Sequence, residues 1–216
     1  MHTRRRFLIG ALAPALLATT ARANVRCLAD PKHGGELCKT FIDIKDAYQE
    51  TYHARHDPAA IWIACVAVVF ATYGHVVQQL RIEQEAYGNI DKVALETSAS
   101  AITPLSRSWR DDDGVAFNVA AETLFDSDAP GAKFDQNALI EAVSNGDPLI
   151  LVGGGHPVVL TAVAFSKASG PTPLVAGFVF DPFPLIGPRP LDIGEVVPQN
   201  AGGDLRYAIR MKLQKA

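Results

Sequence analysis

Residues 58–74 read PAAIWIACVAVVFATYG, and this stretch decides the fold. No side chain in it carries a charge. Proline is favoured at the first helical position and glycine just past the last, so Pro58 and Gly74 mark the two ends of one helix, with Asp57 as its N-cap. A helix that is apolar on every side must be buried on every side. The sequence therefore predicts a central helix around which the rest of the chain packs.

The pattern changes along the chain beyond this helix. Further helices are expected over residues 77–86, 91–98 and 136–143. Apolar runs separated by glycine and proline clusters are typical of strands; the expected strands cover residues 115–119, 148–152, 158–165, 174–180 and 205–213. Helices first and strands later indicate an α+β domain with a largely antiparallel sheet.

The first 23 residues have the parts of an export signal. Residues 4–6 are arginines, and residues 7–17 are an apolar run of about eleven residues, shorter than the 20 or so that span a membrane. Residues 21–23 read Ala-Arg-Ala, a small-x-small cleavage site. The order Thr-Arg-Arg-Arg-Phe-Leu fits a twin-arginine signal peptide, with an ordinary secretory signal as the alternative. We therefore expect a periplasmic or secreted protein.

The length and net charge of the remaining chain limit its number of domains and its possible partners. Removal of residues 1–23, with four arginines and no acidic residue, lowers the formal net charge from −3 to −7 and leaves 193 of the 216 residues. That length suits one domain, expected over residues 41–216 and preceded by a loop-like N-terminal arm, residues 24–40. An acidic chain without a basic run is a poor partner for nucleic acid or anionic membranes. We also expect no membrane span after the signal segment.

The three cysteines are Cys27, Cys38 and Cys65. In an oxidising compartment Cys27 and Cys38 could close a short loop as a disulfide; two unpaired thiols are the alternative. Cys65 has only apolar neighbours in the central helix, which is typical of a buried, unreactive thiol.

Three features could carry chemistry. They are Cys65 in the central helix, His156 after three glycines, and Asp181 at the end of an apolar strand. A histidine can activate a thiol, and a carboxylate can orient the imidazole. The residue types therefore allow a thiol–imidazole–carboxylate site, whereas a simply exposed histidine after a glycine turn is the plainer interpretation.

Four segments, in order, resemble the bacterial papain-like cysteine peptidases, which include the domains that process bacteriocin leaders and certain secreted effector proteases. The segments are WIACVAVVFATYG at 62–74, EQEAYG at 83–88, NGDPLILVGGGHPVV at 145–159 and VFDPFP at 179–184. The resemblance spans about residues 58–190. It implies a papain-like fold, in which a buried N-terminal helix packs on a C-terminal antiparallel sheet. It also implies His156 and Asp181 as the catalytic histidine and its orienting carboxylate.

The nucleophile departs from the pattern of this family. Counted back from Gly74, the family's cysteine falls on Ile61, and Cys65 lies one helical turn further along the same face. The family's oxyanion-donor glutamine is also missing, because no glutamine lies between Gln49 and Gln78. Isoleucine cannot act as a nucleophile.

The resemblance therefore implies a pseudoenzyme that binds a peptide or protein in the former substrate groove. The alternative is an active cysteine peptidase or acyl transferase that uses Cys65, His156 and Asp181. Neither hypothesis requires a cofactor.

A metal site is the weaker interpretation of the other polar clusters. His53 and His56 are three residues apart, but no third ligand is evident, so two solvated histidines are expected. Residues 111–113 are three consecutive aspartates without the spacing of a calcium loop, so a solvated turn is expected there.

Overall fold

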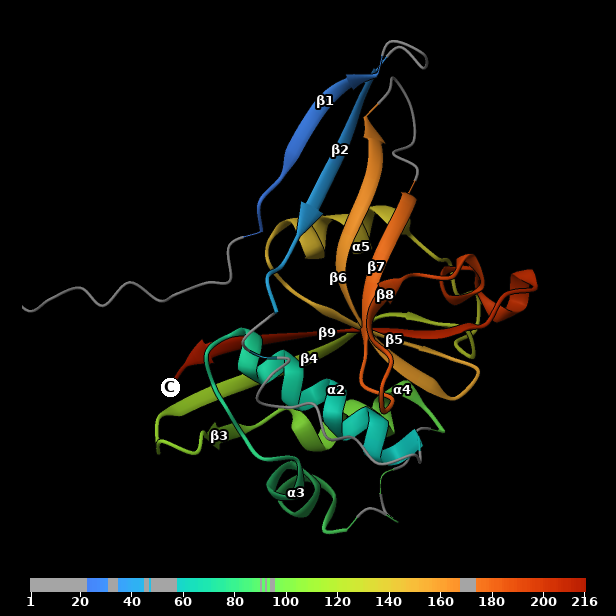
Figure 1. Cartoon of the computed structure of the whole chain (residues 1–216). Coiled ribbons are helices and arrows are strands. Elements are labelled where there is room, and N and C mark those ends of the chain that lie inside the picture. The colour runs from blue at the N-terminus through green and yellow to red at the C-terminus, as the bar shows by residue number, and fades with distance from the viewer. Residues whose placement is uncertain are drawn as a thin grey trace, which may run out of the picture.

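The computed structural model describes residues 23–30, 35–44, 47, 58–89, 91, 93, 96–167 and 174–216. The predicted signal segment lies outside them except for Ala23, and so does Asp57. Within these residues the chain forms a nine-stranded antiparallel sheet with a few, mostly short helices (Figure 1).

The strands and helices alternate irregularly along the chain. The strands are β1 (Arg26–Asp30), β2 (Gly35–Phe41), β3 (Ser108–Arg110), β4 (Ala116–Asp126), β5 (Leu149–Gly153), β6 (His156–Lys167), β7 (Leu174–Asp181), β8 (Gly187–Pro190) and β9 (Leu205–Lys215). The helices are α2 (Pro58–Thr72), α3 (Gln79–Ile82), α4 (Ser98–Ile102) and α5 (Gln136–Ser144), with a π-helical turn η1 (Glu83–Tyr87) and 3₁₀ turns η3 (Thr103–Leu105), η4 (Ile193–Val196) and η5 (Gln199–Ala201).

The sheet is organised around the long strand β6. The strand order is β1-β2-β6-β5-β9-β4-β3, and β7 pairs with both β6 and β8. The first residues of β6 pair with β5 and the later ones with β2, while β7 runs along β6 from Val159 to Phe165. One strand therefore connects the projecting β1–β2 hairpin to the rest of the sheet (Figure 1).

Two hydrophobic cores lie on the two faces of the sheet. In β5, Ile150 and Val152 belong to the core that contains α2, whereas Leu149 and Leu151 belong to the core that contains α5. This alternation follows from the two-residue period of a strand. α2 is the centre of the first core, since every residue from 60 to 70 is at most 2 % exposed.

The central helix confirms the prediction made from residues 58–74. α2 begins at Pro58, and Gly74 follows its end with φ +85°, a conformation that glycine adopts at low cost. α5 is confirmed as well, and the side chain of Asp135 caps it by accepting from Asn137 N–H at 2.9 Å.

The predicted fold class is wrong. We expected an α+β, papain-like arrangement with a buried N-terminal helix packed on a C-terminal sheet, but the described chain is mainly one antiparallel sheet to which both ends contribute. Residues 24–40, expected to be loop-like, contain β1 and most of β2. The helix expected over residues 77–86 is found as α3 continued by the π-helical turn η1, whereas α4 begins only at Ser98, where the helix expected over residues 91–98 should end.

The disulfide prediction is confirmed. Cys27 of β1 and Cys38 of β2 are directly opposite each other and are bonded, with Cα atoms 4.0 Å apart. Cys65 is a free, buried thiol. A structural disulfide fits an oxidising compartment outside the cytoplasm. Among the described helices, none combines the length and the apolar character needed to cross a membrane.

We predict that replacing Cys27 and Cys38 together by alanine lowers the free energy of unfolding by about 2–3 kcal/mol, because the unfolded chain is no longer cross-linked. Urea denaturation with and without a thiol reductant measures this difference. The reductant should destabilise the wild-type protein and leave the double variant unchanged. Equal stability of both proteins without reductant would contradict the prediction.

Candidate functional site

The turn between β5 and β6 places His156. Gly153 and His156 are the closing pair of this hairpin, and Gly154 and Gly155 form its two-residue loop with φ +57° and +79°. Positive φ at both loop positions is typical of the tight turn that matches the twist of paired strands, and glycine adopts it without strain. His156 is therefore the first residue of β6, and its side chain is 34 % exposed.

Asp181 meets His156 because β6 and β7 run antiparallel. The register pairs Val159 with Phe180, so the beginning of β6 lies beside the end of β7. His156 Nε2 lies 2.8 Å from Asp181 Oδ2. Asp181 is 1 % exposed. The structure thus brings together two of the three residues predicted for the site.

Asp181 accepts two further hydrogen bonds. Phe183 N–H donates to Oδ1 at 2.9 Å, and Arg189 Nε donates to Oδ2 at 3.0 Å. Burial acts to raise the pKa of Asp181, but the hydrogen bonds from His156, Phe183 and Arg189 together with the charge of His156 outweigh it, so the pKa is lowered. The carboxylate is therefore ionised at neutral pH and can only accept hydrogen bonds.

This charge state determines the tautomer of His156. Because Asp181 only accepts, Nε2 carries a proton in either charge state of the ring, and Nδ1 is an acceptor whenever the ring is neutral. Within the described residues, no serine, threonine or cysteine is hydrogen-bonded to His156.

Arg189 and Glu195 extend the pair into a four-residue charged network. Arg189 donates from Nη1 and Nη2 to the two Glu195 carboxylate oxygens at 2.8 and 2.6 Å. These bonds, and the one to Asp181, raise the pKa of Arg189 despite its partial burial. Sequence reasoning missed both residues. The available signal was the segment GPRP, which places one cation between two prolines just after Asp181.

Cys65 occupies a different environment from the network. Its side chain is completely buried within the core around α2. Burial and, second, the charge of Asp181 raise the pKa of the thiol well above its ordinary value. No hydrogen bond joins Cys65 to His156 within the described residues. Ile61 is 2 % exposed.

An apolar turn follows Asp181 and joins β7 to β8. Ile186 N–H donates to the carbonyl of Phe183 at 3.1 Å, which closes a four-residue turn around Pro184 and Leu185. Leu185 has φ +72°, the only positive value among the described residues other than glycine, and it is 93 % exposed. A leucine in this conformation is strained and gains nothing from burial, which marks the turn as a functional candidate. We call residues 183–186 the apolar turn.

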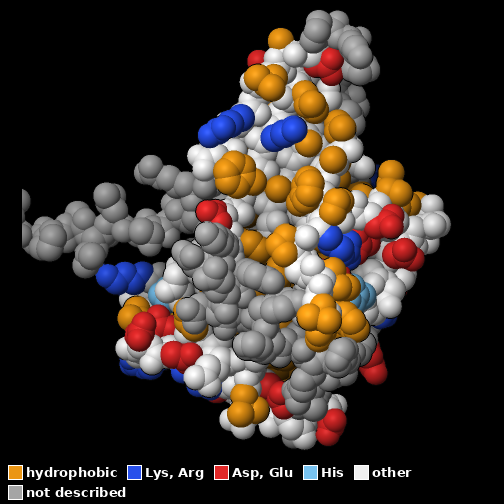
Figure 2. Space-filling model, in the orientation of Figure 1, with side chains coloured by type: hydrophobic (Ala, Val, Ile, Leu, Met, Phe, Trp, Pro, Cys, Tyr) orange, Lys and Arg blue, Asp and Glu red, His pale blue; other side chains and the backbone are white. Residues whose placement is uncertain are grey.

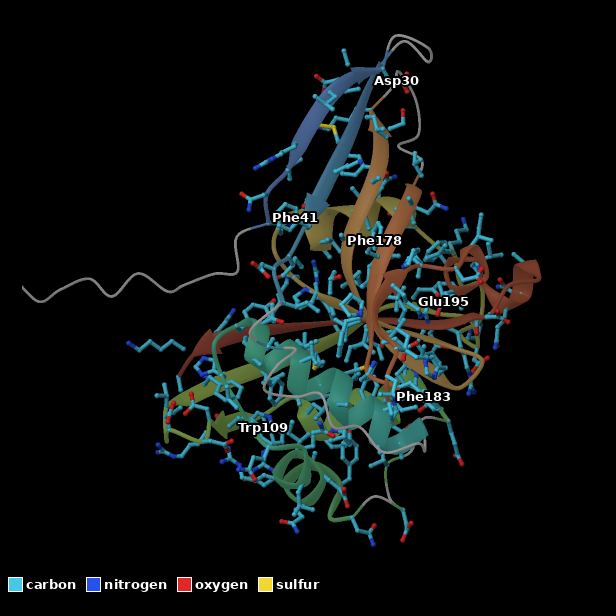
Figure 3. The ribbon with its side chains drawn as sticks, in the orientation of Figure 1. Asp30, Phe41, Trp109, Phe178, Phe183 and Glu195 are labelled. Carbon is cyan, nitrogen blue, oxygen red and sulfur yellow. A yellow bond between two sulfur atoms is a disulfide. The ribbon has the colours of Figure 1, made fainter. Side chains whose placement is uncertain are left out.

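The apolar turn lies beside the histidine. The rings of Phe183 and His156 have centroids 6.0 Å apart, and Ile186 is 47 % exposed. Figure 3 labels Phe183 on this turn and Glu195 on the segment that follows β8. His156, Phe183, Leu185 and Ile186 therefore form one surface with an imidazole ring at one end and exposed apolar side chains at the other.

Of the two polar clusters that the sequence analysis considered for a metal, the structure describes only the aspartates at residues 111–113. His53 and His56 lie outside the described residues. Asp111 is 6 % exposed and binds His75 Nδ1 at 2.9 Å and Val115 N–H at 2.7 Å, so it is a structural carboxylate rather than part of a solvated turn. The cluster Cys27, Glu36 and Cys38 cannot hold a metal through its sulfurs, because these form the disulfide.

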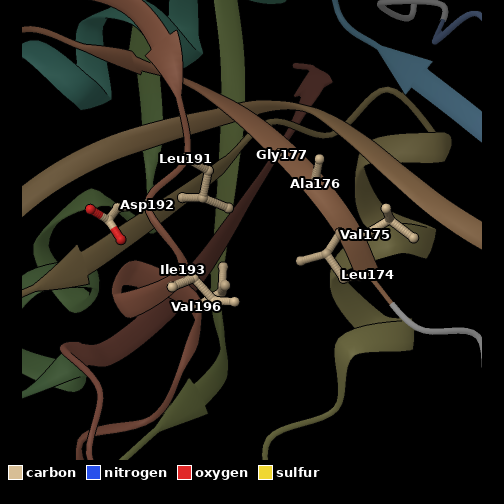
Figure 4. A pocket seen from close by; sticks show the side chains of 8 residues that line it. All are labelled: Leu174, Val175, Ala176, Gly177, Leu191, Asp192, Ile193 and Val196. Atoms are coloured by element: carbon tan, nitrogen blue, oxygen red, sulfur yellow. The ribbon is translucent and has the colours of Figure 1, made fainter.

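A small hollow lies further along β7 (Figure 4). Its volume is about 80 Å³, whereas sites for small-molecule ligands usually measure about 300–1,000 Å³. Mostly apolar side chains line it: Leu174, Val175, Ala176, Leu191, Ile193 and Val196, with Gly177 and Asp192. It is too small for a cofactor and does not include the histidine.

Comparison of the chain with protein-family models, with curated proteins and with solved structures finds no match. The resemblance to papain-like cysteine peptidases therefore depends on the four sequence segments alone.

We predict that iodoacetamide modifies Cys65 in the native protein at least about a hundredfold more slowly than in urea, because a buried thiol reacts only through opening of the structure. Mass spectrometry of timed samples measures the rate. His156→Ala should leave it unchanged. Rapid native alkylation that slows in the His156→Ala variant would instead identify an activated thiol.

Asp181→Asn should lower the free energy of unfolding at pH 7 by about 2–3 kcal/mol, because it removes the charge that three donors surround. The pKa of Asp181 is lowered on folding. Its contribution is therefore complete above the unfolded-state pKa of about 3.9 and is lost as the pH falls through the lower folded-state value.

Urea denaturation between pH 2 and 7 tests this sign, and the wild-type and Asp181→Asn curves should converge at the acidic end. The matched control is Asp128→Asn, which removes a half-exposed carboxylate that also pairs with an arginine, Arg206. It should cost under about 1 kcal/mol at every pH. Curves that diverge toward acid pH would contradict the assignment.

Proposed function

We propose that this chain is an exported, non-catalytic protein that binds a peptide or protein on the surface formed by His156 and the apolar turn. One observation carries the proposal: the thiol that catalysis would need is completely buried with a raised pKa, while His156 is partly exposed and held by its bond to Asp181. Under the resemblance to cysteine peptidases, the chain is a pseudoenzyme with Ile61 at the nucleophile position. The disulfide and the N-terminal signal pattern support a periplasmic or secreted location.

The chemistry of the surface favours a peptide as the ligand. His156 Nδ1 can accept a hydrogen bond from a backbone N–H or a side-chain hydroxyl. Phe183, Leu185 and Ile186 offer apolar contact area next to this acceptor. A peptide can place a backbone N–H on His156 Nδ1 and a neighbouring apolar side chain on the apolar turn. Any extended peptide can present this combination.

The charged network gives the histidine a fixed direction. Asp181 holds the ring at Nε2, and Arg189, itself held by Glu195, holds Asp181. A preorganised polar group binds with a smaller loss of conformational entropy than a free side chain. In an active enzyme this arrangement would serve a nucleophile; here it serves recognition.

The alternative, an active peptidase or acyl transferase that uses Cys65, requires a substrate to reach a thiol with no exposed surface. It also requires that thiol to ionise beside the carboxylate of Asp181, whose charge disfavours the thiolate. The burial of Cys65 and the charge of Asp181 therefore both disfavour catalysis by this thiol.

The variant Leu185→Gly should affect peptide affinity and protein stability in different ways. Glycine relieves the strain of φ +72°, so we predict that the free energy of unfolding stays equal or rises by up to about 1 kcal/mol. The same change removes an exposed apolar contact, so the affinity for a bound peptide should fall about tenfold.

A phage-displayed peptide library selected on the native protein supplies the probe, and calorimetry with the chosen synthetic peptide measures the affinity. Leu80→Gly is the matched control, because Leu80 is also exposed but lies on α3. It should leave the affinity unchanged. Cleavage of the selected peptide by the wild-type protein, abolished by iodoacetamide, would overturn the proposal, as would a selection that yields no binder.

A further inference from the structure

The outer edge of β1 is open within the described part of the chain. β1 is the terminal strand of the sheet and pairs there with β2 alone. The opposite terminal strand is different: β3 has only three residues, and the Arg81 guanidinium binds the backbone carbonyl of Arg110 at its end. Open strand edges pair readily with another strand, so natural proteins usually shorten or cover them.

The register of the β1–β2 ladder shows which backbone groups face outward. The Cα atoms of Cys27 and Cys38 are 4.0 Å apart, which is typical of a pair without mutual hydrogen bonds. Asn24 N–H, three residues earlier, donates to Phe41 on β2. Both observations give the same alternation: residues 24, 26, 28 and 30 bond to β2, while the N–H and C=O groups of Cys27 and Ala29 point to the open edge.

The sequence of β1, Arg-Cys-Leu-Ala-Asp, is complementary to itself in the antiparallel direction. With Leu28 on a two-fold axis, Cys27 of one copy is opposite Ala29 of the other, and both present outward backbone groups. Arg26 of each copy is then opposite Asp30 of the other copy, which gives two such pairs. A register centred on Cys27 or Ala29 pairs neither charge with its opposite. Charge and backbone geometry therefore select the same register.

The side chains on this edge also suit a partner. Leu28 is 75 % exposed, and it lies opposite the partly buried Leu37 of β2. In the Leu28-centred register, the two Leu28 side chains meet at the axis, where side chains of a non-hydrogen-bonded pair come closest, and Leu37 of each copy flanks them on β2. Lys39 is opposite Arg26 on the ladder and adds a second cation facing Asp30 of the other copy. Figure 2 shows apolar and cationic side chains gathered over this end of the molecule.

We propose that the partner of the β1 edge is a second copy of this chain, and that the two β1 strands pair antiparallel about Leu28 to join two sheets into one. The dimer has two-fold symmetry and an isologous interface. Four backbone hydrogen bonds between Cys27 and Ala29, two Arg26–Asp30 ion pairs and the leucine contact hold it. A five-residue strand gives a small interface, so the dimer forms in a concentration-dependent way.

Charge reversal tests both the partner and the register. Arg26→Asp alone places two acidic pairs across the axis, and Asp30→Arg alone places two basic pairs. Each should weaken dimerisation at least about tenfold in sedimentation equilibrium. The double variant Arg26→Asp/Asp30→Arg restores both pairs and should recover the wild-type dissociation constant within about twofold. Circular dichroism checks that each variant is folded.

A mixture of the two single variants gives the most specific test of the register. One then carries only acids and the other only bases at positions 26 and 30, so they should form a heterodimer more tightly than either forms with itself. Ala29→Pro tests the backbone bonds separately, because it removes an outward N–H and leaves the β1–β2 ladder intact.

Two results would overturn the proposal. One is a wild-type protein that stays monomeric at concentrations up to about 1 mM, which would leave the edge to a strand from a different protein. The other is a dimer that neither charge reversal nor Ala29→Pro weakens, which would place the interface elsewhere. Neither outcome bears on peptide binding at His156, whose test is independent.

Discussion

The complete burial of α2 is the constraint on which the rest of the structure depends. A helix without a charged side chain has no face that water solvates well, so strands and short helices must cover it on all sides. β5, β6 and β9 supply alternate side chains to this core and send the intervening ones to the core under α5. The same burial affects Cys65, because it raises the pKa of the thiol and leaves it no exposed surface.

The site follows from strand topology rather than from any single motif. β6 begins at a glycine hairpin and β7 ends at Asp181, and their antiparallel pairing brings His156 and the carboxylate together. Arg189 enters because β8 turns back along β7, which brings its guanidinium to the carboxylate oxygen that His156 also binds. One buried carboxylate thus contacts a partly exposed histidine and the return strand β8 and, through Arg189 and Glu195, the 3₁₀ turn η4.

Local sequence predicted the elements whose signals are local. α2 has proline, glycine and an unbroken apolar run, and α5 has a capping aspartate; both were predicted close to their observed bounds. The adjacency of His156 and Asp181 came from the family resemblance. β1, β2, β3 and β8 were missed because their hydrogen-bond partners lie far away in the sequence or across a turn that also reads as a loop. Without those strands the sheet could not be recognised as the main element, so the fold class was wrong.

The Cys27–Cys38 disulfide connects the oxidising compartment expected for the protein with the geometry of the β1 edge. An oxidising environment allows the Cys27–Cys38 bond, and this bond holds two strands in a narrow pair at one fixed register. A hairpin of two strands is marginal alone, so without the cross-link the register of β1 would be weakly specified. With it, the backbone groups of Cys27 and Ala29 point outward in a defined order.

The same oxidising environment disfavours an exposed catalytic thiol, which would be open to oxidation, whereas Cys65 is shielded inside α2. An oxidising compartment therefore suits both proposals, the pairing of a cross-linked strand edge and a peptide-binding site that does not catalyse.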